Sequence, residues 1–169
     1  MSPVPPVTRR PATSLDLKFL YQVYADSRAP EMALVAAWDE AQKAAFLRSQ
    51  FEAQHTHYHR HYPDAHFDLI LLDGQPIGRL YVCRLEDELR LMDIALLAAA
   101  RGQGIGTALL EELVREADQS ELPMSLYVEG HNPARRLYLR LAFVAAGEAI
   151  PYQFMRRVRA PPAQVKAAS

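Results

Sequence analysis

The chain has 169 residues, of which 50% are hydrophobic, and it carries a formal net charge of -1 at pH 7. This length suits one domain with a substantial core, spanning residues 1–169, and is short for two domains. The near-zero charge gives no electrostatic reason to bind nucleic acid or an anionic membrane, and no apolar run reaches membrane-spanning length. The start of the chain lacks the apolar core of a signal peptide, so we expect a soluble cytoplasmic protein.

The N-terminal segment predicts one edge strand and the start of a helix. Residues 1–6 are proline-rich and predict a flexible tail, and residues 7–10 predict a strand that ends before Pro11. Thr13 and Asp16 have the spacing of a capping box, which predicts that a helix begins there.

That first helix is expected to end near Ser27, because apolar residues repeat at helical spacing up to Tyr24. Residues 28–31 then predict a break. A second helix is predicted over residues 39–62, and Pro63 ends it.

Three strands are expected next. Residues 66–72 and 77–85 predict an antiparallel pair joined by a turn at Asp73-Gly74. The single cysteine, Cys83, lies in the second of these strands, so we expect it to pack in the core rather than act as a nucleophile. A nearly continuous apolar run over residues 89–97 predicts a strand that is covered on both faces.

The sequence R-G-Q-G-I-G at residues 101–106 places three glycines between this strand and a predicted helix. Glycine lets the backbone turn tightly and approach a ligand, and the helix start offers unpaired N–H groups and the positive end of its dipole. The turn therefore predicts an anion cradle for phosphates. A dinucleotide-binding fingerprint would need G-x-G-x-x-G and a P-loop would need a lysine, and this turn has neither.

The rest of the chain predicts a strand at residues 124–128 and a helix over 131–143, in which Asn132 is a strong N-cap and Pro133 suits the first helical position. The last predicted elements are a short strand at residues 143–146, a turn at 147–151, a closing strand at 152–158 and a frayed tail at 159–169. The expected order, βααβββαβαββ, predicts an α+β or mixed-sheet domain.

The R-x-x-G-x-G pattern directly after a strand resembles the acetyl-CoA signature of the GNAT superfamily of acyl-CoA-dependent N-acetyltransferases. The match continues through the helix that opens at Asn132, carries Tyr138 and ends at Phe143. The sequence departs from the family's pattern at Ala98, where the family often has proline, and at Ala142, where it usually has glycine; Asn132 also lies six rather than seven residues before Tyr138. The resemblance implies a mixed, mostly antiparallel sheet of six to seven strands, flanked by about four helices and splayed between its fourth and fifth strands.

The resemblance implies an N-acetyltransferase that moves an acetyl group from acetyl-CoA, its cosubstrate, to an amine of a small molecule or peptide by direct attack. It implies no metal and is compatible with a homodimer. The residues implied to bind acetyl-CoA are Leu96, Leu97, Arg101, Gly102, Gln103, Gly104, Ile105, Gly106, Thr107, Asn132 and Tyr138.

Direct attack needs a neutral amine, a donor for the developing oxyanion and a proton for the departing thiolate. The family pattern assigns the oxyanion to a backbone N–H near Leu96 or Leu97, and the thiolate to Tyr138, which could otherwise be a core residue. With pKa values of about 10 for tyrosine and about 8.5 for a thiol, this proton transfer is uphill by about 2 kcal/mol unless the site lowers the tyrosine pKa. Hydrogen bonding to the thiolate is therefore an alternative role for Tyr138.

Asp93 interrupts the apolar strand that leads into the reaction centre, so it is either the catalytic base or the partner of a basic residue at the edge of the core. Glu86, Glu88 and a chain of water molecules are alternative bases. Freeing a lysine amine at pH 7 costs about 4.6 kcal/mol and an α-amine about 1 kcal/mol, so a weak base would favour an α-amine or a small-molecule acceptor.

In the family, the two-helix region walls the acceptor site. The candidate substrate-binding residues in it are Arg28, Glu31, Trp38, Tyr58 and Tyr62. The histidines at positions 55, 57, 59 and 61 form two i,i+4 pairs that point to different sides of a helix, so we expect a polar helix end rather than a metal site.

The sequence is therefore compatible with two functions of different classes. The first is the acetyltransferase, and the second is a non-catalytic acyl-CoA-binding module used for sensing or assembly. A nucleotide-binding domain is a more distant alternative.

Overall fold

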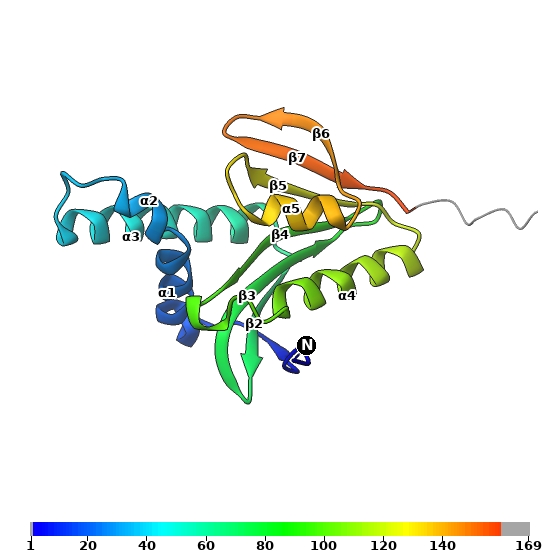
Figure 1. The fold of residues 1–169 in the computed structure, drawn as a ribbon, viewed down its shortest axis with the longest axis horizontal. Coiled ribbons are helices and arrows are strands. Elements are labelled where there is room, and N and C mark those ends of the chain that lie inside the picture. The colour runs from blue at the N-terminus through cyan, green and yellow to red at the C-terminus, as the bar shows by residue number, and fades with distance from the viewer. Residues whose placement is uncertain (1, 160–169) are drawn as a thin grey trace, which may run out of the picture.

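The computed structural model describes residues 2–159, in which seven strands form one sheet with the order β1-β2-β3-β4-β5-β7-β6 (Figure 1). The strands are β1 (Thr8–Pro11), β2 (His66–Leu72), β3 (Gln75–Arg84), β4 (Leu89–Leu96), β5 (Met124–Glu129), β6 (Val144–Ala149) and β7 (Tyr152–Arg157). Neighbouring strands are antiparallel except β4 and β5, which are parallel. The predicted mixed, mostly antiparallel sheet is confirmed.

Five α-helices and two short 3-10 helices accompany the sheet. They are η1 (Ser14–Asp16), α1 (Leu17–Ser27), α2 (Ala29–Ala33), α3 (Glu40–His61), η2 (Ala98–Ala100), α4 (Ile105–Gln119) and α5 (Ala134–Arg140). The break predicted over residues 28–31 is confined to Arg28, because Pro30 lies in the first turn of α2, where its missing N–H has no helical partner to lose. No helix within residues 2–159 combines the length and apolar composition that crossing a membrane would require.

The two faces of the sheet carry separate cores. The core under α4 and α5 includes Leu80, Leu110, Leu126 and Phe143, which are at most 2% exposed. The core under α1 and α3 is smaller and more aromatic, with Leu20, Tyr24, Phe51, Leu69 and Tyr81. Leu80 and Tyr81 are adjacent in β3 and enter opposite cores, as the alternation of side chains along a strand requires.

The parallel pair β4–β5 is short. It consists of Leu89–Leu91 beside Met124–Leu126, after which the two strands are no longer paired. In the other direction β4 pairs with β3 as far as Leu96, and a bulge interrupts this pairing at Met92. The edge of β4 that faces β5 therefore has no strand partner from Met92 to Leu96, which confirms the predicted splay between the fourth and fifth strands; we call this segment the β4–β5 gap.

Some predicted boundaries are shifted in the structure. The first strand includes Pro11, which an edge strand tolerates because its N–H side faces away from the sheet. The sixth strand continues to Ala149 rather than ending before Gly147, because a register shift between Ala145 and Gly147 keeps the chain paired with β7. Of the predicted C-terminal tail, all but residue 159 lies outside the described residues.

Candidate active site

Two cavities lie beside the β4–β5 gap. The first, of about 430 Å³, extends to the start of α5 and to Tyr138, and we call it the α5 cavity. The second, of about 520 Å³, is lined by residues of α1 and α3, and we call it the α3 cavity. Asp93 and Ile94 of β4 line both cavities, as do Tyr127 and Val128 of β5. The gap between the two strands therefore connects the two sides of the site.

A glycine cradle precedes α4. Gly102 and Gly104 have φ angles of 75° and 82°, which side chains rarely allow. A Cβ at Gly102 would meet nothing within 4 Å, and one at Gly104 would meet only the Cγ2 atom of Val4. The first helical bond runs from the Ala108 N–H to Gly104, so the N–H groups of residues 105–107 have no helical partner. The open space, the free donors and the dipole of a 15-residue helix suit a bound phosphate.

The side chain of Arg101 holds this cradle in place. Its Nε donates to the Leu96 carbonyl at 3.0 Å, and its Nη2 contacts the Asp26 carboxylate at 3.1 Å. The same carboxylate accepts the Ala98 N–H at 2.8 Å, which ties η2 to α1. Gln103 in turn donates to the Ala99 carbonyl at 3.1 Å. The predicted cofactor-binding residues Arg101 and Gln103 therefore shape the turn, and Asp26, which sequence reasoning missed, anchors it.

Tyr138 lies in the α5 cavity and is 6% exposed. Burial raises the pKa of its hydroxyl, and the negative charge of Asp93 raises this pKa further. No hydrogen bond to this hydroxyl occurs within residues 2–159. The site thus keeps the phenol protonated, so it can donate a hydrogen bond, but proton release is harder than ordinary pKa values imply.

Helix α5, which carries Tyr138, begins and ends on local signals. The Asn132 side chain accepts the Ala134 N–H at 2.9 Å, so the helix starts two residues after Asn132 rather than directly after it. At the other end, Phe143 donates its N–H to the Tyr138 carbonyl at 3.0 Å, and Ala142 has a φ of 69°. This is a Schellman ending with alanine in the left-handed position, where glycine is usual.

The backbone of β4 supplies donors toward the gap. The Leu97 N–H donates to the Ile77 carbonyl at 2.8 Å, so it is not available to a ligand, which corrects the expectation for that residue. Because N–H groups alternate in direction along a strand, those of Leu96 and Ile94 point away from β3 and toward the gap. Ile94 lines both cavities, whereas Leu96 lines neither. Of these two N–H groups, only that of Ile94 belongs to a residue that lines both cavities.

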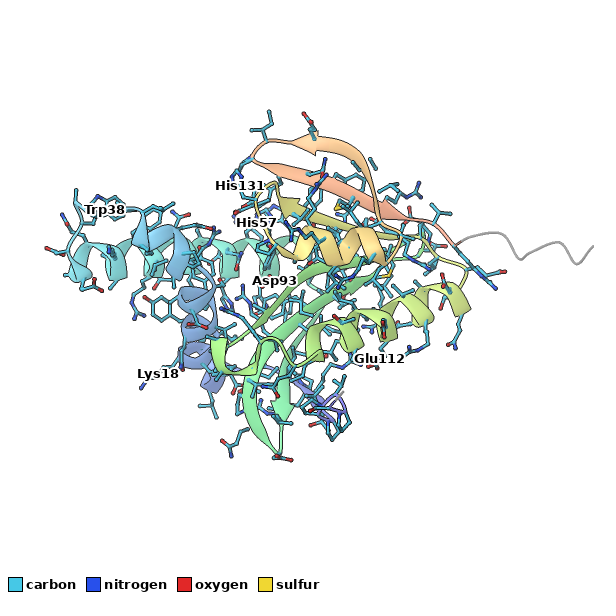
Figure 2. All side chains as sticks on the ribbon, viewed as in Figure 1. Lys18, Trp38, His57, Asp93, Glu112 and His131 are labelled. Atoms are coloured by element: carbon cyan, nitrogen blue, oxygen red, sulfur yellow. The ribbon has the colours of Figure 1, made fainter. Side chains whose placement is uncertain are left out.

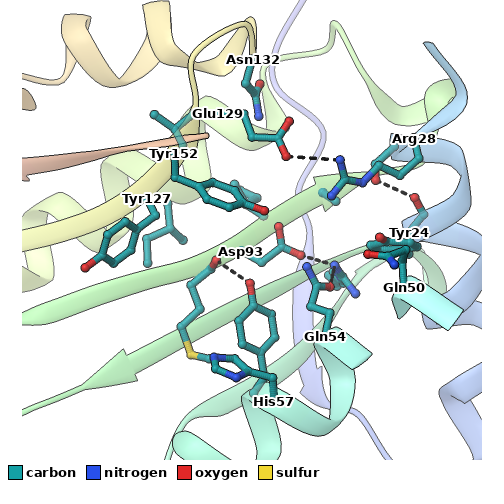
Figure 3. A pocket seen from close by; sticks show the side chains of 18 of the residues that line it. Tyr24, Arg28, Gln50, Gln54, His57, Asp93, Tyr127, Glu129, Asn132 and Tyr152 are labelled. Atoms are coloured by element: carbon teal, nitrogen blue, oxygen red, sulfur yellow. Dashed lines mark hydrogen bonds and ion pairs between the residues drawn. The ribbon is translucent and has the colours of Figure 1, made fainter. Parts of the chain in front are cut away.

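Asp93 is held by a buried arginine. The Nη2 atom of Arg79, a residue only 3% exposed, forms a 2.5 Å ion pair with Asp93 Oδ2 without the geometry of a hydrogen bond. Arg79 Nη2 also donates to Gln54 Oε1 at 2.9 Å, and the guanidinium lies 4.9 Å from the Tyr81 ring centre. The alternative that Asp93 partners a basic residue at the edge of the core is thus realised. Asp93 still lines both cavities, and Figure 3 shows its side chain among those that line the α3 cavity.

The rim of the α3 cavity contains a second charge cluster. Arg28 Nη1 contacts Glu31 at 2.8 Å and Glu129 at 3.3 Å, and so links the helices to the end of β5. Tyr152, which pairs with Glu129 across β5 and β7, lies beside this cluster, whereas Tyr127 lies on the other side of the cavity (Figure 3). The two tyrosines are 42% and 49% exposed. Sequence reasoning missed Glu129 and both tyrosines, because no local pattern shows that these segments face the helices.

Several other predicted residues can be placed. Tyr58 lines the α3 cavity and donates to the Met92 carbonyl at 3.4 Å, and burial raises its pKa. Trp38 lies at the far end of α3, packs on Phe46 and lines neither cavity (Figure 2). Neither Glu86 nor Glu88, the alternative bases, lines a cavity; Glu88 is bonded to Arg90. Arg28, Glu31 and Tyr62 line the α3 cavity.

The histidines of α3 lie in two pairs, one tilted and one stacked. The ring centres of His55 and His59 are 4.3 Å apart, and so are those of His57 and His61. Burial lowers the pKa of His55 and of His59, so these two rings are neutral at pH 7. His57 alone of the four lines the α3 cavity. Within residues 2–159, no group of three or more potential ligands is arranged to hold a metal ion.

Comparisons with known proteins agree with this geometry. The model of the Acetyltransferase (GNAT) family matches residues 21–143. Among solved structures, the PaiA N-acetyltransferase of Thermoplasma acidophilum in complex with coenzyme A has a TM-score of 0.69 and 18% identity, over 91% of this chain and 99% of that one. A histone acetyltransferase HPA2 and related acetyltransferase of Corynebacterium glutamicum has a TM-score of 0.63 and 23% identity, over 93% and 98%. No curated protein matches the chain by sequence.

Proposed function

The chain belongs to the GNAT acetyltransferase family, and we propose that it moves an acetyl group from acetyl-CoA to the amine of a small molecule or peptide by direct attack. The observation that carries this proposal is the meeting of two cavities at the β4–β5 gap. One cavity ends beside a phosphate cradle, and the other has charged and aromatic walls that suit a separate substrate. Two substrates can therefore approach one point from opposite sides.

On the α5 side, the chain offers three kinds of contact to acetyl-CoA. The N–H groups of residues 105–107 would bind the pyrophosphate at the positive end of α4. The unpaired edge of β4 would bond the amides of the pantetheine arm as an added strand would. The thioester would then lie between Ile94 and Tyr138, which both line the α5 cavity.

In the proposed reaction the amine nitrogen attacks the thioester carbonyl carbon, the C–N bond forms and the C–S bond breaks. The Ile94 N–H would donate to the developing oxyanion, since a backbone donor fixed in a strand costs no reorganisation. The Tyr138 hydroxyl would donate a hydrogen bond to the departing thiolate, which its protonated state allows. These assignments use only groups that line the α5 cavity.

A protonated amine must lose one proton to solvent before it can attack, and its nitrogen loses a second proton as the C–N bond becomes an amide. We assign the second proton to Asp93, directly or through water, because Asp93 lines both cavities. Arg79 fixes the position of that carboxylate from the buried side, and Gln54 fixes Arg79. Asp93 thus has one firmly held orientation toward the incoming amine.

A thiol-release assay with acetyl-CoA and a panel of primary amines tests the proposal. Amine-dependent release of free CoA, with the acetylated amine identified by mass spectrometry, is the expected result. If the protein binds acetyl-CoA but releases no thiol with any amine, it is instead a non-catalytic acyl-CoA-binding module. If ATP or a nicotinamide dinucleotide binds more tightly than CoA, the assignment of the cradle is wrong.

A further inference from the structure

The rim of the α3 cavity carries excess negative charge. The single guanidinium of Arg28 is shared between the carboxylates of Glu31 and Glu129, at 2.8 and 3.3 Å. These side chains are 24%, 50% and 27% exposed, so a ligand in the cavity can reach them. Two carboxylates on one cation leave this cluster with a net charge of -1.

The other guanidiniums of the cavity are already neutralised. Arg79 is paired with Asp93 in the interior. All three nitrogens of Arg90 are engaged, with Ser125 at 3.1 Å, Tyr62 at 3.3 Å and Glu88 at 2.7 Å. Among the described residues that line the cavity there is no lysine. Among the described residues that line the cavity, every arginine therefore already has a carboxylate partner, and none is left to bind a carboxylate or phosphate of the acceptor.

Aromatic faces add to this preference. The Arg28 guanidinium lies over the Tyr24 ring, 5.5 Å from its centre. The Arg90 guanidinium lies over the Tyr127 ring, 5.6 Å from its centre. Tyr152, 42% exposed beside Glu129, has no such cation on its ring within residues 2–159 (Figure 3). A tyrosine face next to a carboxylate attracts an ammonium group through both charge and the ring quadrupole.

We infer that the acceptor is a small amine that carries a second ammonium group. This inference rests on the proposed acetyl transfer: one amine reaches the thioester beside Asp93, while the second remains protonated between Glu31, Glu129 and the Tyr152 ring. Its positive charge neutralises the cluster around Arg28. An acceptor with a carboxylate in place of the second ammonium group would be repelled by the carboxylates of this cluster. An acceptor with an apolar group in that place would leave the negative charge of the cluster unpaired.

Three probes of equal chain length separate these cases. Diaminobutane with an amine at each end, butylamine, and aminobutyrate with its amine and carboxylate at opposite ends each contain four carbons. Their far ends are an ammonium group, a methyl group and a carboxylate. We expect kcat/KM for diaminobutane to exceed that for butylamine by at least about 10-fold, and aminobutyrate to be the poorest acceptor. A series of longer diamines with matched monoamines extends the comparison to other spacings. Equal kcat/KM across the charge set at every length, or a preference for aminobutyrate, overturns the inference.

The double variant Glu31→Gln/Glu129→Gln tests the cluster itself. Its expected effect is a rise of about 10-fold or more in KM for the preferred diamine, with the KM for butylamine unchanged. Glu112→Gln, on α4 and away from both cavities, is the matched control and should leave both KM values unchanged (Figure 2). An equal change for both amines in the double variant would show a merely structural role and would contradict the inference.

Failure of the proposed function can be told apart from failure of this inference. If no amine is acetylated, the binding of the same probes to the CoA-saturated protein is measured by calorimetry. Tighter binding of the diamines than of the matched monoamines then supports the inference although the chemistry fails. Equal binding overturns it, whatever the assay of thiol release shows.

Discussion

The two cavities that meet at the β4–β5 gap present different kinds of group to a ligand: mainly backbone on one side and side chains on the other. The α5 cavity reaches Arg101, which is followed by a cradle made of backbone: two glycines with positive φ and the N–H groups at the start of α4. The α3 cavity is made of side chains that come from distant parts of the chain, as in the contact between Arg28 and Glu129, which are 101 residues apart. A backbone site restricts its own residues to glycine and so leaves a local sequence signature. A side-chain site can change its ligand through single substitutions without disturbing the fold.

The largest expected effect is on CoA affinity, through a substitution in the backbone cradle. Gly104→Asp places a carboxylate where we expect phosphate. Two like charges about 4 Å apart repel by about 4 kcal/mol at an effective dielectric constant of about 20, so CoA affinity should fall about 1000-fold. Isothermal calorimetry with CoA measures it.

Gly74→Asp is the matched control for this variant. Gly74 has a φ of 77° and open space around it, so the same substitution carries the same backbone strain, but it lies in the turn between β2 and β3. CoA affinity should be unchanged there. Equal loss of affinity in both variants would mean that strain, and not the charge in the cradle, is responsible.

The next effect concerns Tyr138, which lines the α5 cavity. Tyr138→Phe removes the hydroxyl and keeps the ring against Phe143, so Tm and CoA affinity should hardly change. We expect kcat to fall about 10- to 1000-fold, because one positioned proton donor is lost. Since burial raises the pKa of this hydroxyl, the substitution should not remove any limb of the pH–rate profile below about pH 10.

Tyr21→Phe serves as its control, because Tyr21 donates only to the Ala44 carbonyl and lines neither cavity. It should leave kcat unchanged. If Tyr138→Phe also turns over at the parent rate, Tyr138 is a core residue and another group assists the thiolate.

A third prediction concerns stability on the side-chain half. Arg79→Met leaves Asp93 without its cation, and we expect a loss of about 3 kcal/mol in the free energy of unfolding. Adding Asp93→Asn should restore part of this loss, because it removes the unpaired charge. The surface pair of Arg9 and Glu112 gives the contrast: Arg9→Met should cost less than about 1 kcal/mol. Urea unfolding of the four proteins measures these differences, and equal costs for both arginines would contradict the assigned role of Arg79.

The same difference between backbone and side-chain groups explains how much of this site the sequence predicts. The strand over 66–72, the glycine turn and the splay were predictable, because each depends on local pattern or on the resemblance. Tyr138 and Asp93 could be proposed from the sequence because one lies in a motif and the other interrupts an apolar strand, and both line the α5 cavity. The sequence predicts the oxyanion donor near Leu96 or Leu97, whereas we propose Ile94, since only the register with β3 shows which N–H groups are free.

The side-chain half was less predictable for a physical reason. Arg79 interrupts an apolar strand as Asp93 does, and the alternation of β3 could have revealed it, but its partner on β4 depends on register. Glu129 and Tyr152 enter the cavity only through the pairing of β5 with β7. Trp38 was expected in the pocket because it lies in the two-helix region, yet the length of α3 carries it to the far end.

The smallest expected effect concerns a local departure on the backbone half, Ala142. Its φ of 69° costs an alanine about 1–2 kcal/mol relative to the right-handed region, and glycine avoids this cost. Glycine also raises the conformational entropy of the unfolded chain, which offsets about 0.4–1 kcal/mol. Ala142→Gly should therefore stabilise the protein by roughly 0.5–1 kcal/mol and raise Tm by about 1–4 °C. Ala108→Gly, at a helical position whose N–H bonds to Gly104, should have the opposite sign and cost about 1 kcal/mol. Calorimetric unfolding of the two variants checks both signs; a loss of stability in Ala142→Gly would show that the Ala142 methyl group contributes more through packing than its backbone conformation costs.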